Sequence, residues 1–534
     1  MGWGIKRLVL LSICLGSAVQ AAPATTTSFG RFSGILRHDG IKRDQFAKLD
    51  FIPSREEGNT LYLKAILTLH FGDFASGEYV GIHFDDVRFD SNISTRSLVF
   101  EQPDQPVTLV VRKFNGTDFI GDFRSNYGGA SGQIILSSKQ MPALKYPLIE
   151  PVWGEYRGVC NSRFTNKPVE TILQMFTYRS IGVSKQGGNP FRAYTVTGTI
   201  GEKSEESCAR YQGKECVWGQ ITQGSFNFFK NGLTVFTSHG NLVCSQGNGG
   251  IDCNGCSTLM RTSVEMTRPQ LIQPVQAAPA WAEVNEPPAG DVSTLQGEYT
   301  GYLHHEYLDT YQNAAFNLLT YQAPAKPGET SSLRMSAIAT LYFGDLNGAE
   351  SLSYHYEERG YPNPLTTPQI VFSQADADVD SILQVTKFGG GEVSGIWFSR
   401  HFGRVGTFHF RKDGKVALPK SAKMMQELSG DFSGEKWDLY TTIGLAHAEP
   451  GNQNPFSPLE FGGWAIMKNG LTPKYDAQGG SYDFYTGRIF MDFEDGNAFV
   501  GQRDGREKIS LRKVYSKVTS PMQEFHLLKF NLVK

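Results

Sequence analysis

One short motif opens the chain's domain-sized segments at four places. A glycine, any residue, Phe or Tyr, any residue and a second glycine occur at residues 30–34, 154–158, 297–301 and 430–434. Solenoid repeats are only about 20 to 50 residues long, whereas units of about 100 residues can each bury a core of their own. The spacing therefore predicts four modules, each with its own hydrophobic core.

The modules alternate between two types. Residues 65–86 align without a gap with residues 337–358, and residues 111–136 align in the same way with residues 385–410. The second and fourth modules share fewer residues, and we interpret the pattern as a two-module unit that was duplicated as a unit. We name the modules A1 (residues 28–138), B1 (152–263), A2 (295–416) and B2 (428–515).

The segments between the modules are rich in proline. Residues 264–294 contain five prolines among Ala and Gln, and they predict the main linker between two halves of the chain. We expect few contacts to cross this linker, so that limited proteolysis would separate the halves. Residues 516–534 form a C-terminal tail, which we interpret as a strand that packs on another module.

Short β-branched or aromatic segments bounded by Gly, Asp, Asn or Pro dominate the chain, for example residues 62–71, 79–84, 107–111 and 132–136. No long segment has the 3.6-residue apolar period of an amphipathic helix. We therefore predict an all-β protein of four antiparallel meander modules, each a barrel or a sandwich of seven or eight strands, in an A-B-A-B tandem duplication.

The opening Gly-x-aromatic strand and the closing glycine-rich hairpin, as at residues 394–397 and 404–408, resemble the lipocalin-like (calycin) β-barrels. The resemblance implies a barrel whose interior holds a small apolar ligand. Large side chains recur at equivalent positions of A1 and A2, and this bulk predicts filled interiors instead. These pairs are Phe71 and Phe343, Phe84 and Tyr356, Phe114 and Phe388, and Phe123 and Trp397. Recognition would then use loops and outer faces, including hairpin tips at Tyr127 and His401.

Residues 1–21 have the pattern of a secretory signal peptide. Lys6 and Arg7 precede a short apolar run, and small residues end the segment at Ala21. The run is too short for a membrane anchor, and Ile13 before Cys14 argues against lipidation. The chain has 51 basic and 53 acidic residues and no basic patch, so we predict no nucleic-acid partner and no transmembrane helix. The expected location is the periplasm, the cell surface or the medium.

All cysteines that follow the signal peptide lie in B1: Cys160, Cys208, Cys216, Cys244, Cys253 and Cys256. An even number of cysteines in an exported protein predicts disulfides, here three. We expect the pairs Cys208–Cys216, Cys244–Cys253 and Cys160–Cys256. The alternative is a metal or redox site, because residues 253–256 form a C-x-x-C motif, but a zinc ribbon needs two such motifs.

A histidine followed two residues later by an acid recurs in both A modules. His83 with Asp85, and His355 with Glu357, would share one strand face, with Phe84 and Tyr356 on the other. Such pairs can bind a metal or transfer a proton. The ordinary alternation of a half-buried strand explains them better. His38 and His305 also correspond, and they would complete a metal-like cluster if the first strand lay beside the His83 strand. No cofactor motif is present.

These features favour an exported binding or structural component of a Gram-negative-type envelope or the extracellular space. The partner would be an envelope component, a protein or a small ligand. One alternative is a secreted hydrolase acting on envelope polymers, which would need a carboxylate pair or a metal in one groove. Another is an outer-membrane β-barrel, because alternating aromatic strands also suit lipid. The disulfide-rich module, the proline linkers and the terminal Lys534 argue against the second alternative.

Overall fold

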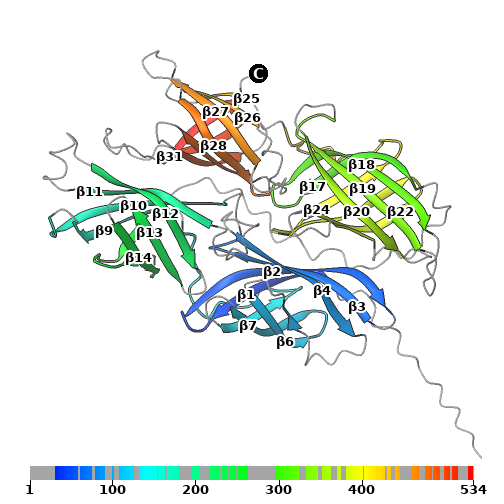
Figure 1. The fold of residues 1–534 in the computed structure, drawn as a ribbon, viewed down its shortest axis with the longest axis horizontal. Coiled ribbons are helices and arrows are strands. Elements are labelled where there is room, and N and C mark those ends of the chain that lie inside the picture. Colours follow the sequence, from blue (N-terminus) through cyan, green and yellow to red (C-terminus); the bar gives the residue numbers. More distant parts are fainter. Residues whose placement is uncertain are drawn as a thin grey trace, which may run out of the picture.

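The computed structural model describes residues 30–532 with gaps. The gaps are residues 58–59, 75–78, 91–98, 102–106, 126–130, 153, 163–164, 180–193, 204–215, 228–230, 238–239, 248, 263–294, 324–331, 347–350, 362–369, 374–380, 401, 427–429, 435–438, 446–458, 468–474, 484, 494–497, 505–507 and 515–526. The described residues form strands and no helix, arranged in four antiparallel eight-stranded sheets (Figure 1). The all-β prediction is confirmed. The signal peptide, the linker at 264–294 and Tyr127 lie outside the described residues.

The A1 sheet is a meander that curls back on itself. Its strands are β1 (Arg31–His38), β2 (Arg43–Glu57), β3 (Thr60–His70), β4 (Tyr79–Asp90), β5 (Val99–Phe100), β6 (Val107–Phe114), β7 (Asp118–Ser125) and β8 (Ser131–Ser137). The order is β4-β3-β2-β1-β8-β7-β6-β5, so the first strand, β1, pairs with the last strand, β8, and the two edge strands are β4 and β5. The edge strands β4 and β5 come within contact distance of each other, which nearly closes a barrel.

A2 repeats this arrangement strand for strand. Its strands are β17 (Gly297–His305), β18 (Thr310–Ala323), β19 (Ser332–Tyr342), β20 (Ser351–Tyr361), β21 (Val371–Phe372), β22 (Ser381–Gly389), β23 (Glu392–Ser399) and β24 (Gly403–Arg411). The order β20-β19-β18-β17-β24-β23-β22-β21 matches that of A1. The shared order agrees with a duplication of the A module, while the duplication of the whole A-B unit stays a prediction.

B1 and B2 are closed barrels. B1 consists of β9 (Gly154–Asn161), β10 (Pro168–Arg179), β11 (Tyr194–Lys203), β12 (Cys216–Asn227), β13 (Gly232–Thr237), β14 (Gly240–Gln246), β15 (Gly250–Cys253) and β16 (Leu259–Thr262). B2 consists of β25 (Gly430–Gly434), β26 (Leu439–Leu445), β27 (Leu459–Met467), β28 (Tyr475–Asp483), β29 (Arg488–Phe493), β30 (Ala498–Asp504), β31 (Lys508–Val514) and β32 (Leu527–Leu532).

The C-terminal strand corrects one predicted boundary. We expected residues 516–534 to be a tail that packs on another module, but β32 pairs with β31 and with β25 inside B2. A barrel needs its last strand to pair with its first, because unpaired edge groups would otherwise remain. B2 therefore extends past residue 515 and includes β32.

Aromatic side chains pack inside the A barrels. In A1, the Phe51 ring lies 5.6 Å from Phe32, 5.7 Å from Phe100 and 6.0 Å from Phe119, measured between ring centroids. In A2, Phe316 lies 5.4 Å from Phe410. The bulky pairs singled out in the sequence are buried, except that Phe114 is only partly so. This packing agrees with the prediction of filled interiors.

The connector after each A module docks on that module. In A1, the Asp44 backbone accepts a hydrogen bond from Ile149 N at 2.8 Å, and Ile149 O accepts one from Gly72 N at 2.7 Å. In A2, Tyr311 O accepts a bond from Met425 N, and Met425 O accepts one from Gly344 N at 3.1 Å. Both connectors therefore add a short parallel bridge to the start of the second strand.

The hydrophobic cores run across module boundaries. One cluster of buried side chains includes residues of both A1 and B1, and Phe71 meets Phe226 with centroids 5.9 Å apart. A second cluster includes A2 and B2, and it also takes in Tyr79 of A1. A third, smaller cluster joins A1 to A2. The expectation that few contacts link the two halves is therefore wrong, because outward-facing apolar residues of A1 are covered by A2.

Candidate functional site

The His83 motif lies where A1 meets A2. On β4, Phe84 points into the A1 core, while His83 and Asp85 lie on the outer face with Nε2 and Oδ2 4.0 Å apart. Lys64 Nζ lies 2.7 Å from Asp85 Oδ1, and Arg400 Nη1 of A2 lies 3.4 Å from Asp85 Oδ2. The predicted shared face is present, and its carboxylate forms ion pairs with two cations, one of them from another module.

These cations decide the charge of Asp85. Burial alone would raise the pKa of Asp85, but the charges of Lys64 and Arg400 outweigh it and lower that pKa to about 2. Burial lowers the pKa of Lys64 against the pull of Asp85. A carboxylate that stays ionised and holds two cations is suited to joining surfaces, and it is a poor proton donor at neutral pH.

The corresponding pair in A2 lies on an outer face. His355 and Glu357 are exposed on β20, and Tyr356 is buried between them. His355 pairs with Ile338 of β19, as His83 pairs with Ile66 of β3. The same motif therefore occupies a covered face in A1 and an open face in A2.

His38 and His305 lie inside the barrels, away from these motifs. His38 Nε2 lies 3.1 Å from Gln45 Oε1, and His305 Nε2 lies 2.8 Å from Gln312 Oε1. Burial is the main cause that lowers the pKa of each histidine to about 4, against the opposing effect of the hydrogen bond that the ring donates to its glutamine. Both rings are therefore neutral and structural at pH 7.

The strand order keeps His38 apart from His83. β1 pairs with β2 and β8, and two strands separate it from β4. The predicted convergence of two histidines and a carboxylate needed β1 beside β4, so the structure does not bring them together. Within the described ranges, no three His, Cys, Asp or Glu side chains form a group that could hold a metal ion.

Sequence reasoning missed a second polar network at the A1–A2 boundary. Arg31 of A1 binds Asp50 through two hydrogen bonds of 2.9 and 3.2 Å, and its Nη2 donates to Arg404 O of A2 at 2.7 Å. Arg404 N donates to Asp50 Oδ2 at 2.8 Å, and the Arg404 guanidinium binds Glu306. Part of this network could have been found from the sequence, because alternation along one strand places Asp50 and Ile52 together on its outer face.

Lys48 and His70 lie beside this network. Burial, followed by the charge of Arg31, lowers the pKa of Lys48 to about 7, although Asp50 and Glu306 act in the opposite direction. Burial and the charge of Lys48 hold the pKa of His70 well below its ordinary value. Lys48 Nζ also lies 4.6 Å from the centre of the Phe74 ring.

The turn between β23 and β24 of A2 inserts Phe402 between three modules. The Phe402 ring meets Tyr79 of A1 edge-on at 4.8 Å and stacks on Tyr485 of B2 at 5.6 Å. Phe402 O accepts a hydrogen bond from Thr68 Oγ1 at 3.0 Å, and Tyr79 OH donates to Asp483 of B2. We expected this hairpin tip to be a recognition loop. His401 itself lies outside the described residues, and its neighbours Arg400 and Phe402 are buried.

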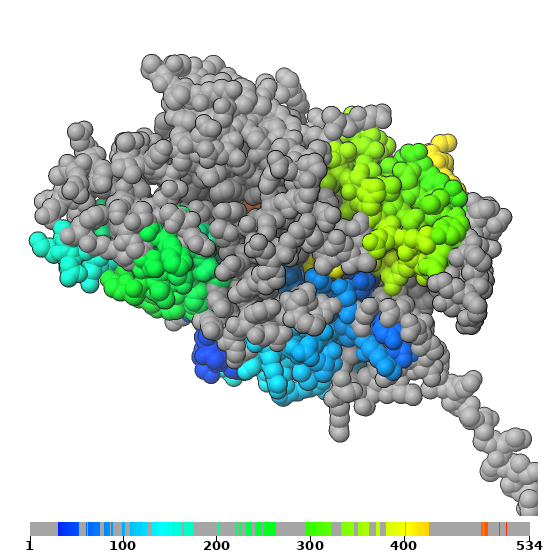
Figure 2. Space-filling view, viewed as in Figure 1, coloured from blue at the N-terminus to red at the C-terminus, as the bar shows by residue number. Residues whose placement is uncertain are grey.

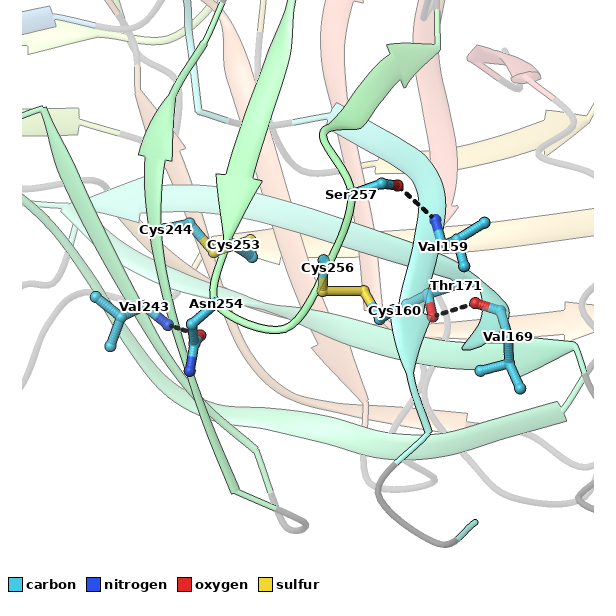
Figure 3. Close-up of a disulfide and its surroundings, with 10 residues drawn as sticks. All are labelled: Val159, Cys160, Val169, Thr171, Val243, Cys244, Cys253, Asn254, Cys256 and Ser257. Carbon is cyan, nitrogen blue, oxygen red and sulfur yellow. Dashed lines mark hydrogen bonds between the residues drawn. A yellow bond between two sulfur atoms is a disulfide. The ribbon is translucent and has the colours of Figure 1, made fainter. Parts of the chain in front are cut away.

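Two disulfides fix one end of B1, as Figure 3 shows. Cys160 on β9 bonds Cys256, and Cys244 on β14 bonds Cys253. These are two of the three pairings expected from the sequence. Cys208 lies outside the described residues, as does the side chain of Cys216. Disulfides persist in oxidising compartments, so the bonds indicate an oxidising environment.

The loop between the two disulfides is also held by hydrogen bonds. Asn254 Oδ1 accepts from Val243 N at 2.8 Å, and Ser257 Oγ accepts from Val159 N at 3.0 Å. Figure 3 shows both bonds, one on each side of the loop. Val159 and Val243 are exposed. The disulfides and hydrogen bonds together fix this end of the barrel, where the side chains of Val159 and Val243 face solvent.

No family model, curated protein or solved structure matches the chain. The described residues include no helix with the length and hydrophobicity that crossing a membrane requires. The function proposed below is therefore argued from the geometry at the boundaries between modules.

Proposed function

We propose that the protein is an exported binding or structural component of a cell envelope or the extracellular space. One observation carries the proposal. The acid of the repeated histidine motif, Asp85, forms ion pairs with Lys64 and with Arg400 of a different module. The residues that most resembled a catalytic or metal site thus connect module A1 to module A2.

Two further features support this function. The disulfides of B1 suit an oxidising compartment, in line with the signal-like residues 1–21. The continuous cores and the boundary networks join the four modules, whose outer faces are available for contacts. We propose that these faces and the disulfide-bonded end of B1 bind an envelope component.

The export part can be tested in a Gram-negative host. The chain with its own N-terminus should be recovered from the periplasm or the medium, cleaved after Ala21. Its six remaining cysteines should resist a thiol-specific alkylating reagent until they are reduced. Uncleaved protein in the cytoplasm with reactive thiols would contradict export.

The binding part needs a test that also detects hydrolysis. Purified protein is mixed with isolated envelope fragments, sedimented, and the supernatant is searched for released fragments by mass spectrometry. We expect co-sedimentation without release. Release that disappears in the Glu357→Gln or His355→Gln variant would show a hydrolase and overturn the proposal.

A further inference from the structure

A face of A1 that is covered by A2 has an equivalent in A2 itself. In A1, Ile66 pairs with Asp50 of β2 on one side and with His83 of β4 on the other. In A2, Ile338 pairs with Asn317 of β18 and with His355 of β20. Ile52 and Leu319 occupy matching positions on the neighbouring strand.

The two faces differ in exposure. Ile52 and Ile66 of A1 are 0% and 1% exposed, because they pack on Val371, Ile382 and Phe398 of A2. Leu319, Tyr321 and Ile338 of A2 are 50%, 44% and 36% exposed. We call the outer surface formed by Leu319, Tyr321, Ile338 and His355 the open face. The strands that carry it form part of the green surface of A2 in Figure 2.

Clustered apolar side chains on a sheet face usually mark an interaction site. Within this chain, the equivalent face of A1 binds a module of the same type. We propose that the open face binds a second copy of this chain, through the open face of that copy.

The face of A1 that corresponds to the Ile382 and Phe398 face of A2 does not suit the open face. The positions of A1 that match Ile382 and Phe398 carry Thr108 and Arg124, which form the same cross-strand pair. A head-to-tail stack would therefore place polar side chains on Leu319 and Ile338. Two open faces bring apolar side chains together, and such a symmetric contact closes as a dimer.

The charges on the open face permit contact with its own copy. Tyr321 donates a hydrogen bond to Glu358, and Arg334 is close enough to affect the same phenol. A face with one sign of charge would repel its copy. Here a two-fold axis can place Glu358 of one copy beside Arg334 of the other.

The test is sedimentation equilibrium of the purified full-length protein across micromolar concentrations. The wild-type protein should show a monomer–dimer equilibrium, and the Leu319→Glu/Ile338→Glu variant should associate at least about tenfold more weakly. The control is Leu144→Glu, which changes a side chain that is 46% exposed on the connector after A1 and should leave association unchanged. Both substituted positions are exposed, so an unchanged melting temperature will verify folding.

A cysteine variant tests the symmetry independently. Ser336 pairs with Leu319 on the open face, so Ser336→Cys should cross-link two copies with a short bifunctional thiol reagent. A monomeric wild-type protein would overturn the proposal. So would a dimer that survives the double variant, a Leu144→Glu effect of the same size, growth beyond the dimer, or failure of Ser336→Cys to cross-link.

Discussion

The Arg400 guanidinium of the third barrel lies 3.4 Å from the Asp85 carboxylate of the first, although 315 residues separate them in the chain. Arg400 is almost fully buried, and Asp85 is one of the groups that balance its charge. Removing one partner of a buried ion pair leaves a charge without compensation, which costs more than the pair contributes.

The first prediction concerns this pair. Asp85→Asn should lower the free energy of unfolding at pH 7 by about 1–3 kcal/mol, measured by urea denaturation. Asp122→Asn is the control, because its partner Arg112 is largely exposed, and exposed pairs contribute about 0–1 kcal/mol. The pKa of Asp85 is depressed to about 2, so the pair stabilises the fold above about pH 4 and the contribution disappears as pH falls through 2. Equal effects of the two variants would contradict the assignment.

The second prediction concerns the buried histidines. The pKa of His38 and of His305 is lowered to about 4 from 6.5, so the unfolded chain binds more protons than the fold between these values. Stability should therefore fall as pH drops from about 6.5 to 4, by up to about 3 kcal/mol for each histidine. The His38→Gln/His305→Gln variant should flatten the pH dependence of the unfolding free energy. His355→Gln, on the open face, is the control and should retain the wild-type slope.

The third prediction separates the two disulfides. Cys160–Cys256 closes a loop with a sequence separation of 96, and Cys244–Cys253 closes one of 9. Loop-closure entropy then gives a stabilisation of about 5 kcal/mol for the first bond and about 3 kcal/mol for the second. Calorimetry of the two double Cys→Ser variants should show a larger loss for Cys160/Cys256. An equal or reversed order would show that chain entropy does not dominate.

The fourth prediction concerns the contact between the halves. Gly403 has φ +78°, and a Cβ there would lie 2.5 Å from Asp50 Oδ2 and 2.9 Å from Thr68 Oγ1 of A1. After cleavage at a protease site inserted within residues 264–294, the wild-type halves should co-elute, and Gly403→Ala should weaken their association, because the Asp50 and Thr68 side chains must move to make room for the methyl group. Gly390→Ala is the control, because Gly390 also has a positive φ of +61° but open space around its Cβ position. Separation of the wild-type halves would contradict a stable boundary.

The strands were predictable because alternation carries their signal. Residues 62–71 and 107–111 were identified from β-branched and aromatic side chains, and they fall within or next to β3 and β6. The opening glycine motifs mark the first strand of every sheet. Alternation with a period of two residues indicates which side chains share a face of a strand, and the repeated glycine motif indicates how many modules contain such strands.

The boundary between A1 and A2 was not predictable in the same way. Ile52 and Ile66 alternate with inward residues and so look like half-buried strand positions, whatever covers them. Their partner Phe398 lies more than 300 residues away, and no local pattern relates the two. The position of His38 depended on strand order, which alternation does not encode. A pattern along the chain defines faces, whereas the fold decides which faces meet.

The connectors bear on how the molecule would respond to tension. Each docks through a few backbone hydrogen bonds, such as Ile149 N to Asp44 O and Met425 N to Tyr311 O, while the barrels hold long ladders. Pulling an A module away from the B module that follows it must separate the core that the two modules share, such as the contact of Phe71 with Phe226, and it then loads those few bonds before any ladder. Each residue peeled from the barrel adds up to about 3.5 Å of length. Once the shared core has separated, undocking of the connectors would therefore lengthen the molecule under force before any ladder of the barrels opens.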